Sequence, residues 1–439
     1  MTELEQKLRR APYESYAYSY PHKSAYRVLE PAVGLADAWA QEPKDSLFLY
    51  LHVPFCEMRC GFCNLFTTAN PEDEARDAYL KAFERQAEAV GRALGRARFA
   101  RMAVGGGTPT YLDPASLDSL FRIAARVFGA DPHDVPTSCE TSPLTASRDR
   151  LRVLRERGVG RLSIGVQSFD EREARAAGRP QKTDDVLRAL ALIREEGFPV
   201  LNIDLIYGLP GQGVRSWLGS LAAALRFAPE ELYLYPLYVR PLTGLERRPK
   251  EWDDVRLACY REGRALLLAE GYEQVSMRMF RSARAPSEGG PAYCCQDDGM
   301  VGVGCGARSY TSALHYSDEY AVGACGVREI IARYSARTPR EFGRAAYGFS
   351  LDGAEQRRRF VVKSLLRAEG LELSAYRGRF GTEPEEDVPE LRALVEGGLA
   401  AAGASTLGLT EAGLELSDAI GPFLYSARVR ELMGTYELH

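Results

Sequence analysis

The sequence lacks the features that mark several large classes of protein. Its 439 residues contain no apolar run near the roughly 20 residues that a membrane-spanning helix needs, and the N-terminal segment has no apolar core like that of a signal peptide. Basic residues form no long run and the net charge is −4, which argues against an electrostatic nucleic-acid binder. The cysteines number nine, an odd total in a long chain and unlike a secreted disulfide framework. We therefore expect a cytoplasmic protein with no membrane segment and no nucleic-acid partner.

Histidine is also scarce, with only 5 in the chain, and this limits what the cysteines can do. Cys56, Cys60 and Cys63 form a Cys-x3-Cys-x2-Cys pattern just after an apolar run at 47–53. A structural zinc site normally uses four ligands, and no second pair of cysteines or histidines lies nearby. Three cysteines can instead hold a [4Fe–4S] cluster that keeps one iron open for a ligand from outside the protein. The pattern favours such a cluster over zinc or buried free thiols.

Apolar runs and helical segments alternate regularly from residue 46 onward. The apolar runs predict six strands, at 47–53, 99–104, 137–140, 161–166, 201–205 and 232–237. Each is followed by helical periodicity, at 72–94, 114–128, 146–157, 183–196, 214–226 and 252–270. This alternation implies parallel strands joined by right-handed crossovers, and six units fall short of the eight in a full barrel. We predict an α/β fold built on a partial (β/α)6 TIM-type barrel.

The rest of the chain divides around this barrel. We predict four segments: an N-terminal arm at 1–45, the barrel at 46–280, a loop-rich sheet extension at 281–350, and a C-terminal winged-helix-like α+β module at 351–439. The last helix of the module carries acidic rather than basic residues, unlike the recognition helix of a DNA-binding winged helix. We therefore expect the module to be structural or to cover substrate. In the arm, the tyrosines either pack along the main domain, or Tyr20, His22 and Lys23 cover an active site and contact an anionic substrate.

A short polar or glycine-containing motif follows each predicted strand. The carboxyl ends of the strands are where the chemistry of such folds is located. An iron left open by three cysteines can be chelated by the amine and carboxylate of S-adenosylmethionine, whose reductive cleavage gives methionine and a 5′-deoxyadenosyl radical able to activate C–H bonds. The glycines at 105–107 would let backbone N–H groups approach the methionyl part. Glu140, Gln167 and Asp204 offer acceptors for the ribose hydroxyls and the amine of the cofactor. Arg179 can form an ion pair with its methionyl carboxylate. Phe62 can shield the cluster and pack near the adenine.

Four stretches together resemble the oxygen-independent coproporphyrinogen III oxidase-like group of radical S-adenosylmethionine enzymes. They are the cysteine motif with its strand (50–63), GGGTPTYL (105–112), SIGVQSF (163–169) and NIDLIYGLPGQ (202–212). The resemblance covers most of the chain and implies an enzyme of the oxidoreductase or transferase type. It implies that the positions contacting the cluster-bound cofactor are Tyr50, Gly106, Gly107, Thr108, Glu140, Gln167, Arg179 and Asp204. It also implies a flavodoxin- or ferredoxin-type reductant.

Leu65 departs from the oxidases of this group, which have a further cysteine at that position. Members without that cysteine include carbon-radical methyltransferases and cyclopropanases, which bind a second S-adenosylmethionine. We therefore expect C–H activation of a small organic substrate, with or without methyl or methylene transfer from a second S-adenosylmethionine. Two alternatives stay open: coproporphyrinogen III dehydrogenase-like oxidation of a tetrapyrrole, and binding or trafficking of haem.

Three further residues are candidates for the substrate chemistry. Cys294 and Cys295 are adjacent, which reflects either one buried thiol beside an incidental one or a thiol acid/base pair near the substrate. Arg308 lies in a glycine-rich stretch and is a candidate for contact with an anionic substrate or a second cofactor. The remaining cysteines, which we assign to packing, are Cys139, Cys259, Cys305 and Cys325.

Overall fold

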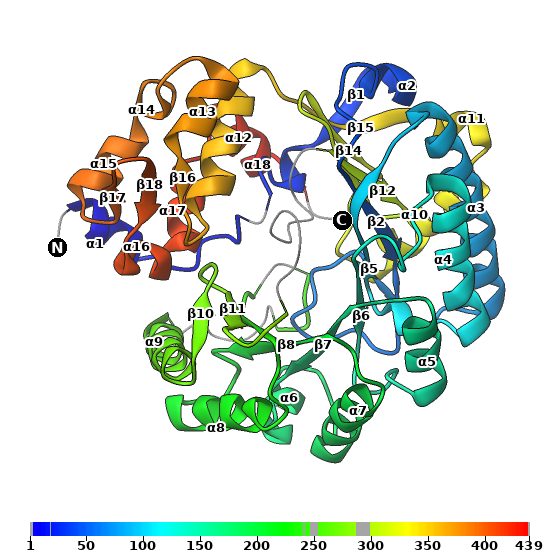
Figure 1. The fold of residues 1–439 in the computed structure, drawn as a ribbon, viewed down its shortest axis with the longest axis horizontal. Coiled ribbons are helices and arrows are strands. Elements are labelled where there is room, and N and C mark those ends of the chain that lie inside the picture. The colour runs from blue at the N-terminus through cyan, green and yellow to red at the C-terminus, as the bar shows by residue number, and fades with distance from the viewer. Residues whose placement is uncertain (1–2, 18, 240–241, 246–252, 287–298, 438–439) are drawn as a thin grey trace.

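A computed structural model describes residues 3–17, 19–239, 242–245, 253–286 and 299–437 of the chain. One large sheet dominates it, with 13 strands in the order β1-β15-β14-β13-β12-β2-β5-β6-β7-β8-β9-β11-β10. The sheet curves into an open barrel with helices along its outside, and the C-terminal helices lie across the opening (Figure 1).

The central strands of this sheet are parallel and match the six predicted strands. They are β2 (Leu47–Val53), β5 (Phe99–Gly106), β6 (Thr137–Thr141), β7 (Arg161–Gln167), β8 (Val200–Tyr207) and β9 (Glu231–Pro236). The helices that follow them are α3 (Asp73–Leu94), α4 (Pro114–Phe128), α5 (Arg148–Glu156), α6 (Glu171–Ala176), α7 (Thr183–Glu195), α8 (Val214–Leu225) and α9 (Asp253–Ala269). The predicted partial barrel is confirmed.

Helix α4 shows how the local sequence sets these elements. Asp113 caps its start, because the carboxylate accepts hydrogen bonds from the backbone N–H groups of Ala115 and Ser116, each at 3.0 Å. Pro114 occupies the first helical position, where no N–H is needed. Gly129 ends the helix in the left-handed conformation with φ of 63°. The start and end of this helix, and hence the length of the loop that follows β5, are therefore encoded locally.

Both edges of the parallel sheet are extended by further strands. Strand β12 (Met300–Val303) pairs in parallel with β2 and adds a seventh parallel strand that the sequence pattern did not predict. Antiparallel strands continue from β12: β13 (Arg308–Tyr310), β14 (Leu314–Ser317), β15 (Arg344–Ser350) and β1 (Arg27–Gly34). At the other edge the hairpin of β10 (Tyr272–Gln274) and β11 (Met279–Ser282) pairs with β9. Shorter elements around the sheet are α2 (Leu35–Ala38), β3 (Phe55–Cys56), β4 (Thr68–Ala69), a 3-10 turn at Pro109–Tyr111, α10 (Ala324–Ala336) and α11 (Pro339–Phe342).

The C-terminal module has its own small sheet and its own core. Its elements are α12 (Gly353–Leu365), β16 (Leu371–Glu372), α13 (Leu373–Phe380), α14 (Pro384–Asp387), α15 (Glu390–Glu396), β17 (Ala400–Ala402), β18 (Thr406–Leu409), α16 (Glu411–Glu415), α17 (Ser417–Phe423) and α18 (Ala427–Gly434). The N-terminal arm contributes α1 (Glu3–Arg9) and a 3-10 turn at Lys23–Ala25. Leu8, Tyr20 and Tyr26 of the arm belong to the apolar core of this module, separate from the barrel core.

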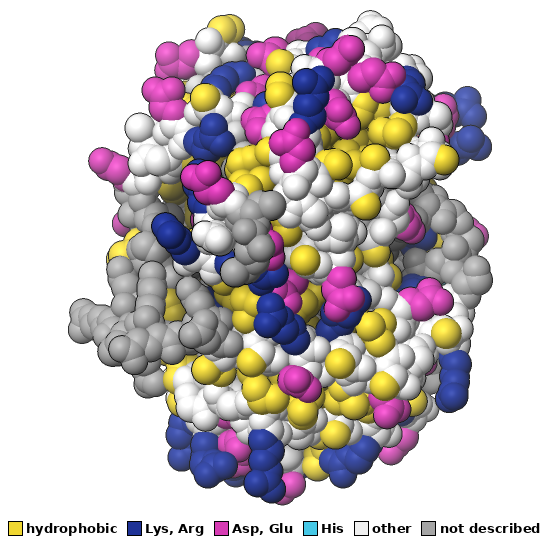
Figure 2. Space-filling model, turned by 90° about the vertical axis from the view of Figure 1, so that its left-hand side faces the viewer, with side chains coloured by type: hydrophobic (Ala, Val, Ile, Leu, Met, Phe, Trp, Pro, Cys, Tyr) yellow, Lys and Arg dark blue, Asp and Glu magenta, His cyan; other side chains and the backbone are white. Residues whose placement is uncertain are grey.

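Ion pairs connect the module to the edge of the barrel at α9 and the β10–β11 hairpin. Arg261 pairs with Glu415 at 2.6 Å and Arg264 with Glu411 at 2.7 Å. Arg278 and Asp418 form a third, fully buried pair. Figure 2 shows the face of the molecule that carries the module, where acidic and basic side chains are interspersed over the upper part. No helix in the described part of the chain has both the length and the apolar character of a transmembrane span.

Candidate active site

A cavity of about 830 Å³ opens at the carboxyl ends of the parallel strands. Its volume is near the top of the roughly 300–1,000 Å³ range of small-molecule sites. All seven parallel strands contribute to its lining, through Met300, Tyr50, Val104, Glu140, Gln167, Asp204 and Tyr235 in sheet order. This is the edge of the sheet where the sequence predicted the chemistry to be.

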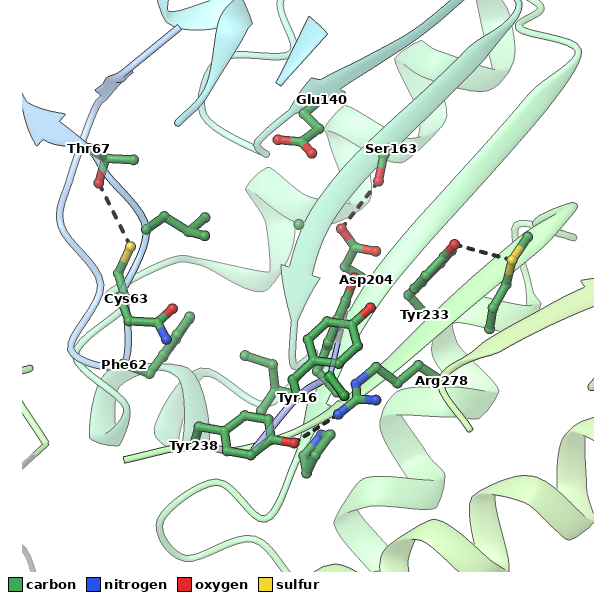
Figure 3. Close-up of a pocket in the computed structure, with 18 of the residues that line it drawn as sticks. Tyr16, Phe62, Cys63, Thr67, Glu140, Ser163, Asp204, Tyr233, Tyr238 and Arg278 are labelled. Carbon is green, nitrogen blue, oxygen red and sulfur yellow. Dashed lines mark hydrogen bonds between the residues drawn. The ribbon is translucent and has the colours of Figure 1, made fainter. Parts of the chain in front are cut away.

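The three motif cysteines line this cavity from the loop after β2. The Thr108 hydroxyl donates to the Cys56 thiol at 3.6 Å, and Arg179 donates from Nη1 to Cys60 Sγ at 3.1 Å. The third thiol, of Cys63, lies 3.8 Å from the hydroxyl of Thr67 (Figure 3). Burial raises the pKa of Cys56 to about 12 and also raises the pKa of Cys60. Without a metal these two groups are therefore protonated thiols at neutral pH.

The cysteine loop is held against the barrel by backbone contacts. Gly61 donates its N–H to the Gly178 carbonyl at 3.2 Å and accepts from the Leu245 N–H at 3.0 Å. A Cβ at position 61 would lie 2.7 Å from the carbonyl oxygen of Ala177, so the close approach requires glycine. The loop is thus fixed on two sides independently of its thiols.

The thiols suit a cube-shaped iron–sulfur cluster. Among the described residues, no group of three or more His, Cys, Asp or Glu side chains is gathered closely enough for a single metal ion. A [4Fe–4S] cluster does not require such convergence, because each cysteine binds a different iron. The donors around the thiols, an arginine and two hydroxyls, are groups that stabilise sulfur carrying negative charge. The residues present therefore fit the cluster.

The three glycines at the end of β5, Gly105 to Gly107, each lie close to a different part of the site. A Cβ on Gly105 would lie 2.8 Å from the Glu140 carboxyl carbon, and one on Gly107 would lie 2.9 Å from Cys56 Sγ. At Gly106 the backbone has φ of 114°, and a Cβ would lie 2.5 Å from the His52 ring. The N–H of Gly106 donates to Glu140 and that of Gly107 to the Val53 carbonyl. These two N–H groups are engaged within the protein, and the glycines provide space for close approach of the backbone. Contact of this stretch with the methionyl part of the cofactor stays a prediction.

Two carboxylates, of Glu140 on β6 and Asp204 on β8, line the cavity. Burial, reinforced by the negative charge of Asp204, raises the pKa of Glu140 to about 7. Burial likewise raises the pKa of Asp204 to about 6, although hydrogen bonds from Asn202 at 2.8 Å and Ser163 at 3.2 Å oppose the shift. At neutral pH the pair carries more than one negative charge on the cavity wall, and a cationic ligand such as an amine or a sulfonium would neutralise part of it.

Arg179 connects the cysteine loop to strand β7. Besides its contact with Cys60, it donates from Nη2 to the Gly165 carbonyl at 2.7 Å and from Nε to Gln181 at 2.9 Å. Gln167, at the end of the same strand, has φ of 71°, a left-handed conformation that is unusual for a residue other than glycine. Both side chains line the cavity, as do Tyr50 and Thr108.

Phe62 belongs to a small apolar wall beside the cysteines. It packs against a cluster that includes Ile206, Leu209 and Leu237 and lines the same cavity. The structure therefore brings together around one cavity all the described candidates for the cluster and the cofactor. They are Tyr50, Cys56, Cys60, Phe62, Cys63, Gly107, Thr108, Glu140, Gln167, Arg179 and Asp204, with Gly106 at an adjoining hollow of about 120 Å³.

The candidates for substrate chemistry have different placements. Arg308 lines both the main cavity and the adjoining hollow. In the arm, His22 and Lys23 line the cavity, whereas Tyr20 is fully buried and donates a hydrogen bond to Glu355.

The cysteines outside the cluster motif differ in their surroundings. Cys294 and Cys295 lie outside the described residues. Cys139, Cys259 and Cys305 are buried, as expected for packing residues. The assignment of Cys325 to packing was wrong, since it is exposed near the start of helix α10, where few side chains surround it.

The residues that form the cavity wall opposite the cysteines were not predicted from the sequence. Figure 3 shows Tyr233 and Arg278 on the far side of Asp204 from Cys63, with Tyr16 and Tyr238 below Asp204. They come from the arm, from β9 and the loop after it, and from the β10–β11 hairpin. The alternation of Tyr233 and Tyr235 along a predicted strand was the one available signal.

These features define an α/β-barrel enzyme site with a three-cysteine cluster motif beside a large ligand cavity. The sequence model of the Radical SAM superfamily matches residues 50–222 of this chain. The haem chaperone HemW of Escherichia coli (strain K12) is 32% identical over 272 residues, which cover 60% of this chain and 69% of that protein. The oxygen-independent coproporphyrinogen III oxidase of the same strain is 33% identical over 281 residues, 61% of each chain. The solved structure of E. coli coproporphyrinogen III oxidase (HemN) has a TM-score of 0.77 at 25% identity, covering 93% of this chain and 96% of that chain.

The chain therefore belongs to the radical S-adenosylmethionine superfamily, in the group that contains these oxidases and HemW. Membership makes it an enzyme that uses a [4Fe–4S] cluster and S-adenosylmethionine. The resemblance read from the sequence motifs is thus confirmed.

Proposed function

We propose that this enzyme activates a C–H bond of a small organic substrate held in the 830 Å³ cavity, with S-adenosylmethionine as the radical source. The observation that carries the proposal is that the three thiols and the carboxylates of Glu140 and Asp204 line one cavity, which has further space beside them. When bound, the cluster and its cofactor supply a 5′-deoxyadenosyl radical. The residues of the chain bind the cofactor, orient it and exclude water.

The roles of the cofactor-binding residues follow from their charge and position. Cys56, Cys60 and Cys63 would hold the cluster. Arg179, already 3.1 Å from the Cys60 thiol, is placed to pair with the carboxylate of a cofactor bound there. Glu140 and Asp204 would accept from its amine and its ribose hydroxyls.

Methyl or methylene transfer from a second S-adenosylmethionine is the form of this chemistry that we favour. Leu65 stands where the oxidases of the group have a further cysteine, and its side chain is 52% exposed and lines the cavity. The cavity volume, near the upper end of the range for single small ligands, supports room for two molecules. We further propose a flavodoxin- or ferredoxin-type reductant, because the chain offers no described redox group besides the cysteine motif.

The decisive experiment is product analysis after anaerobic reconstitution with iron and sulfide. Dithionite and S-adenosylmethionine are added, and 5′-deoxyadenosine is measured by mass spectrometry in wild type and in Cys56→Ala. We expect cleavage in wild type alone. Equal, background amounts from both proteins would overturn the proposal. Deuterium transfer from a labelled candidate substrate into 5′-deoxyadenosine then identifies the hydrogen donor, with coproporphyrinogen III included to test tetrapyrrole oxidation.

Binding or trafficking of haem is a second candidate, suggested by the similarity to HemW. Of the histidines that the structure describes, only His22 lines the main cavity, while His52 is buried and its pKa is lowered by burial to about 4. His22 is thus the side chain that this candidate would use as an axial ligand. Haem titration of wild type and His22→Ala separates the candidates: a Soret shift that His22→Ala abolishes favours haem binding, and no shift in wild type excludes it.

A further inference from the structure

The cavity wall opposite the cysteines is built from stacked aromatic rings. Tyr233 and Tyr235 lie on the cavity face of β9, alternating with the fully buried Leu232 and Leu234. Their ring centroids are 5.9 Å apart with planes 21° from parallel. Tyr16 of the arm meets Tyr235 edge-on, with centroids 6.3 Å apart and planes at 66°. Three rings from two distant parts of the chain therefore form one surface.

Two methionines add to the apolar surface of this wall. Met277 and Met279 of the β10–β11 hairpin also line the cavity, and the Tyr233 hydroxyl lies 3.2 Å from Met279 Sδ. Thioether and aromatic surfaces attract the edges and faces of planar rings. The composition favours a flat, polarisable ligand over a saturated one.

The positive charge of Arg278 on this wall is already neutralised by an ion pair within the protein. The Arg278 guanidinium lies 3.7 Å from the centre of the Tyr16 ring, and its Nη2 is 2.5 Å from Asp418 Oδ1. Arg278 is 4% exposed and Asp418 is 1% exposed, so the pair is shielded from water. Tyr238 donates a further hydrogen bond to Asp418 and accepts one from Arg278 at 2.8 Å. A ligand carboxylate here would have to displace Asp418 from a buried pair, which is costly.

Two further positively charged side chains of the cavity are also engaged within the protein. Lys363 and Arg367 line it from the C-terminal module, and both already interact with other groups of the protein. Among the described residues, the wall around Tyr235 therefore offers stacking area without a free charge. An uncharged ring gains the stacking energy there and pays no cost for breaking an ion pair.

We propose that the wall formed by Tyr16, Tyr233 and Tyr235 is the substrate subsite, and that it takes an uncharged planar aromatic or conjugated ring. The inference deepens the proposed function, because it names the class of molecule that receives the radical chemistry. Asp204 lies between Tyr233 and Cys63, with Tyr16 next to Asp204, so a ring stacked on Tyr233 is beside the cofactor region and not within it (Figure 3).

Binding of simple probes tests this subsite without turnover. The cluster-reconstituted full chain, saturated with S-adenosylmethionine and without reductant, is titrated calorimetrically with 2-naphthol, 2-naphthoate and cyclohexanol. We expect 2-naphthol to bind at least tenfold more tightly than either the anionic ring or the saturated alcohol. Tighter binding of 2-naphthoate, equal binding of cyclohexanol, or no binding of 2-naphthol would overturn the proposal.

Matched variants locate the binding. Tyr235→Leu should weaken 2-naphthol binding about tenfold, since stacking on an aromatic side chain contributes that much, whereas Tyr235→Phe should retain it. Tyr347→Leu, at a half-buried tyrosine on β15, controls for general loosening. If Tyr235→Leu does not fold, Tyr233→Leu replaces it. Unchanged affinity in the leucine variant would overturn the proposal, and 5′-deoxyadenosine formation by wild type reports on the proposed function separately.

Discussion

Glu140→Gln should make the protein more stable at pH 8 while weakening cofactor binding. The wild-type carboxyl borders the cavity, and its pKa rises from an ordinary value of 4.5 to about 7 on folding because the surrounding protein removes water from it. At 1.36 kcal/mol per pKa unit the full shift corresponds to about 3 kcal/mol. Because Glu140 is exposed to the cavity, solvent there screens part of this cost, and holding the carboxyl ionised above pH 7 costs about 1 kcal/mol. Glutamine keeps an oxygen that can accept from the Gly106 N–H, 3.1 Å away in wild type, and carries no charge.

The sign of the pH dependence follows from where the proton binds. Between pH 4.5 and about 7 the folded protein holds a proton on Glu140 that the unfolded chain has lost. The contribution of Glu140 to the free energy of unfolding therefore falls as pH rises through this window. Below pH 4.5 both states are protonated and the penalty vanishes. The advantage of Glu140→Gln should accordingly grow from near zero at pH 4.5 to its maximum at pH 8.

Thermal unfolding without added S-adenosylmethionine measures this difference. At about 1–2 °C per kcal/mol for a chain of this size, the variant should unfold about 1–2 °C above wild type at pH 8. Glu273→Gln, at an exposed position on β10, should show no such gap. Addition of S-adenosylmethionine should raise the Tm of wild type more than that of Glu140→Gln. A variant less stable than wild type at pH 8, or a Tm gap independent of pH, would refute the reasoning.

Three further substitutions test other parts of the structure. Gly107→Ala should lower bound iron per chain several-fold, because its Cβ would lie 2.9 Å from Cys56 Sγ, whereas Gly219→Ala, with open space around it, should not. Arg179→Gln should raise the KM for S-adenosylmethionine about tenfold in the 5′-deoxyadenosine assay, with the exposed Arg188→Gln as control; an unchanged KM would exclude the carboxylate pair. Asp418→Asn should destabilise the protein by about 3–5 kcal/mol, since it leaves Arg278 buried without its counter-charge, and the double variant Arg278→Met/Asp418→Leu should recover most of the lost Tm.

The central sheet could be predicted because its signals are local. Each buried parallel strand is a short apolar run, and each crossover helix carries its own periodicity and caps, as Asp113 and Gly129 do for α4. Strand β12 could not be recognised, because Met300–Val303 is only 4 residues long and includes a glycine. Its place beside β2 is set by long-range pairing that leaves no local pattern.

The cofactor half of the site was also accessible from sequence, because its residues follow strands in a fixed order. The opposite wall was not, since Tyr16, Tyr235, Arg278 and Asp418 lie far apart in the chain and converge only in the folded protein. Their pairing depends on the C-terminal module packing across the barrel opening. The chemistry of radical generation was thus easier to predict than the recognition of the substrate.

The separate core of the C-terminal module has a consequence for synthesis on the ribosome. Leu8, Tyr20 and Tyr26 emerge first, yet their apolar partners, such as Leu394 and Ile420, are made last. The barrel core draws on residues from Tyr13 to Ala345 and can begin to form before those partners appear. Leu8, Tyr20 and Tyr26 must stay unburied through nearly all of translation, and the cavity gains its final wall only when the C-terminal module packs against the barrel. Iron loaded onto a nascent barrel would therefore be exposed to solvent and oxygen until the last residues are in place.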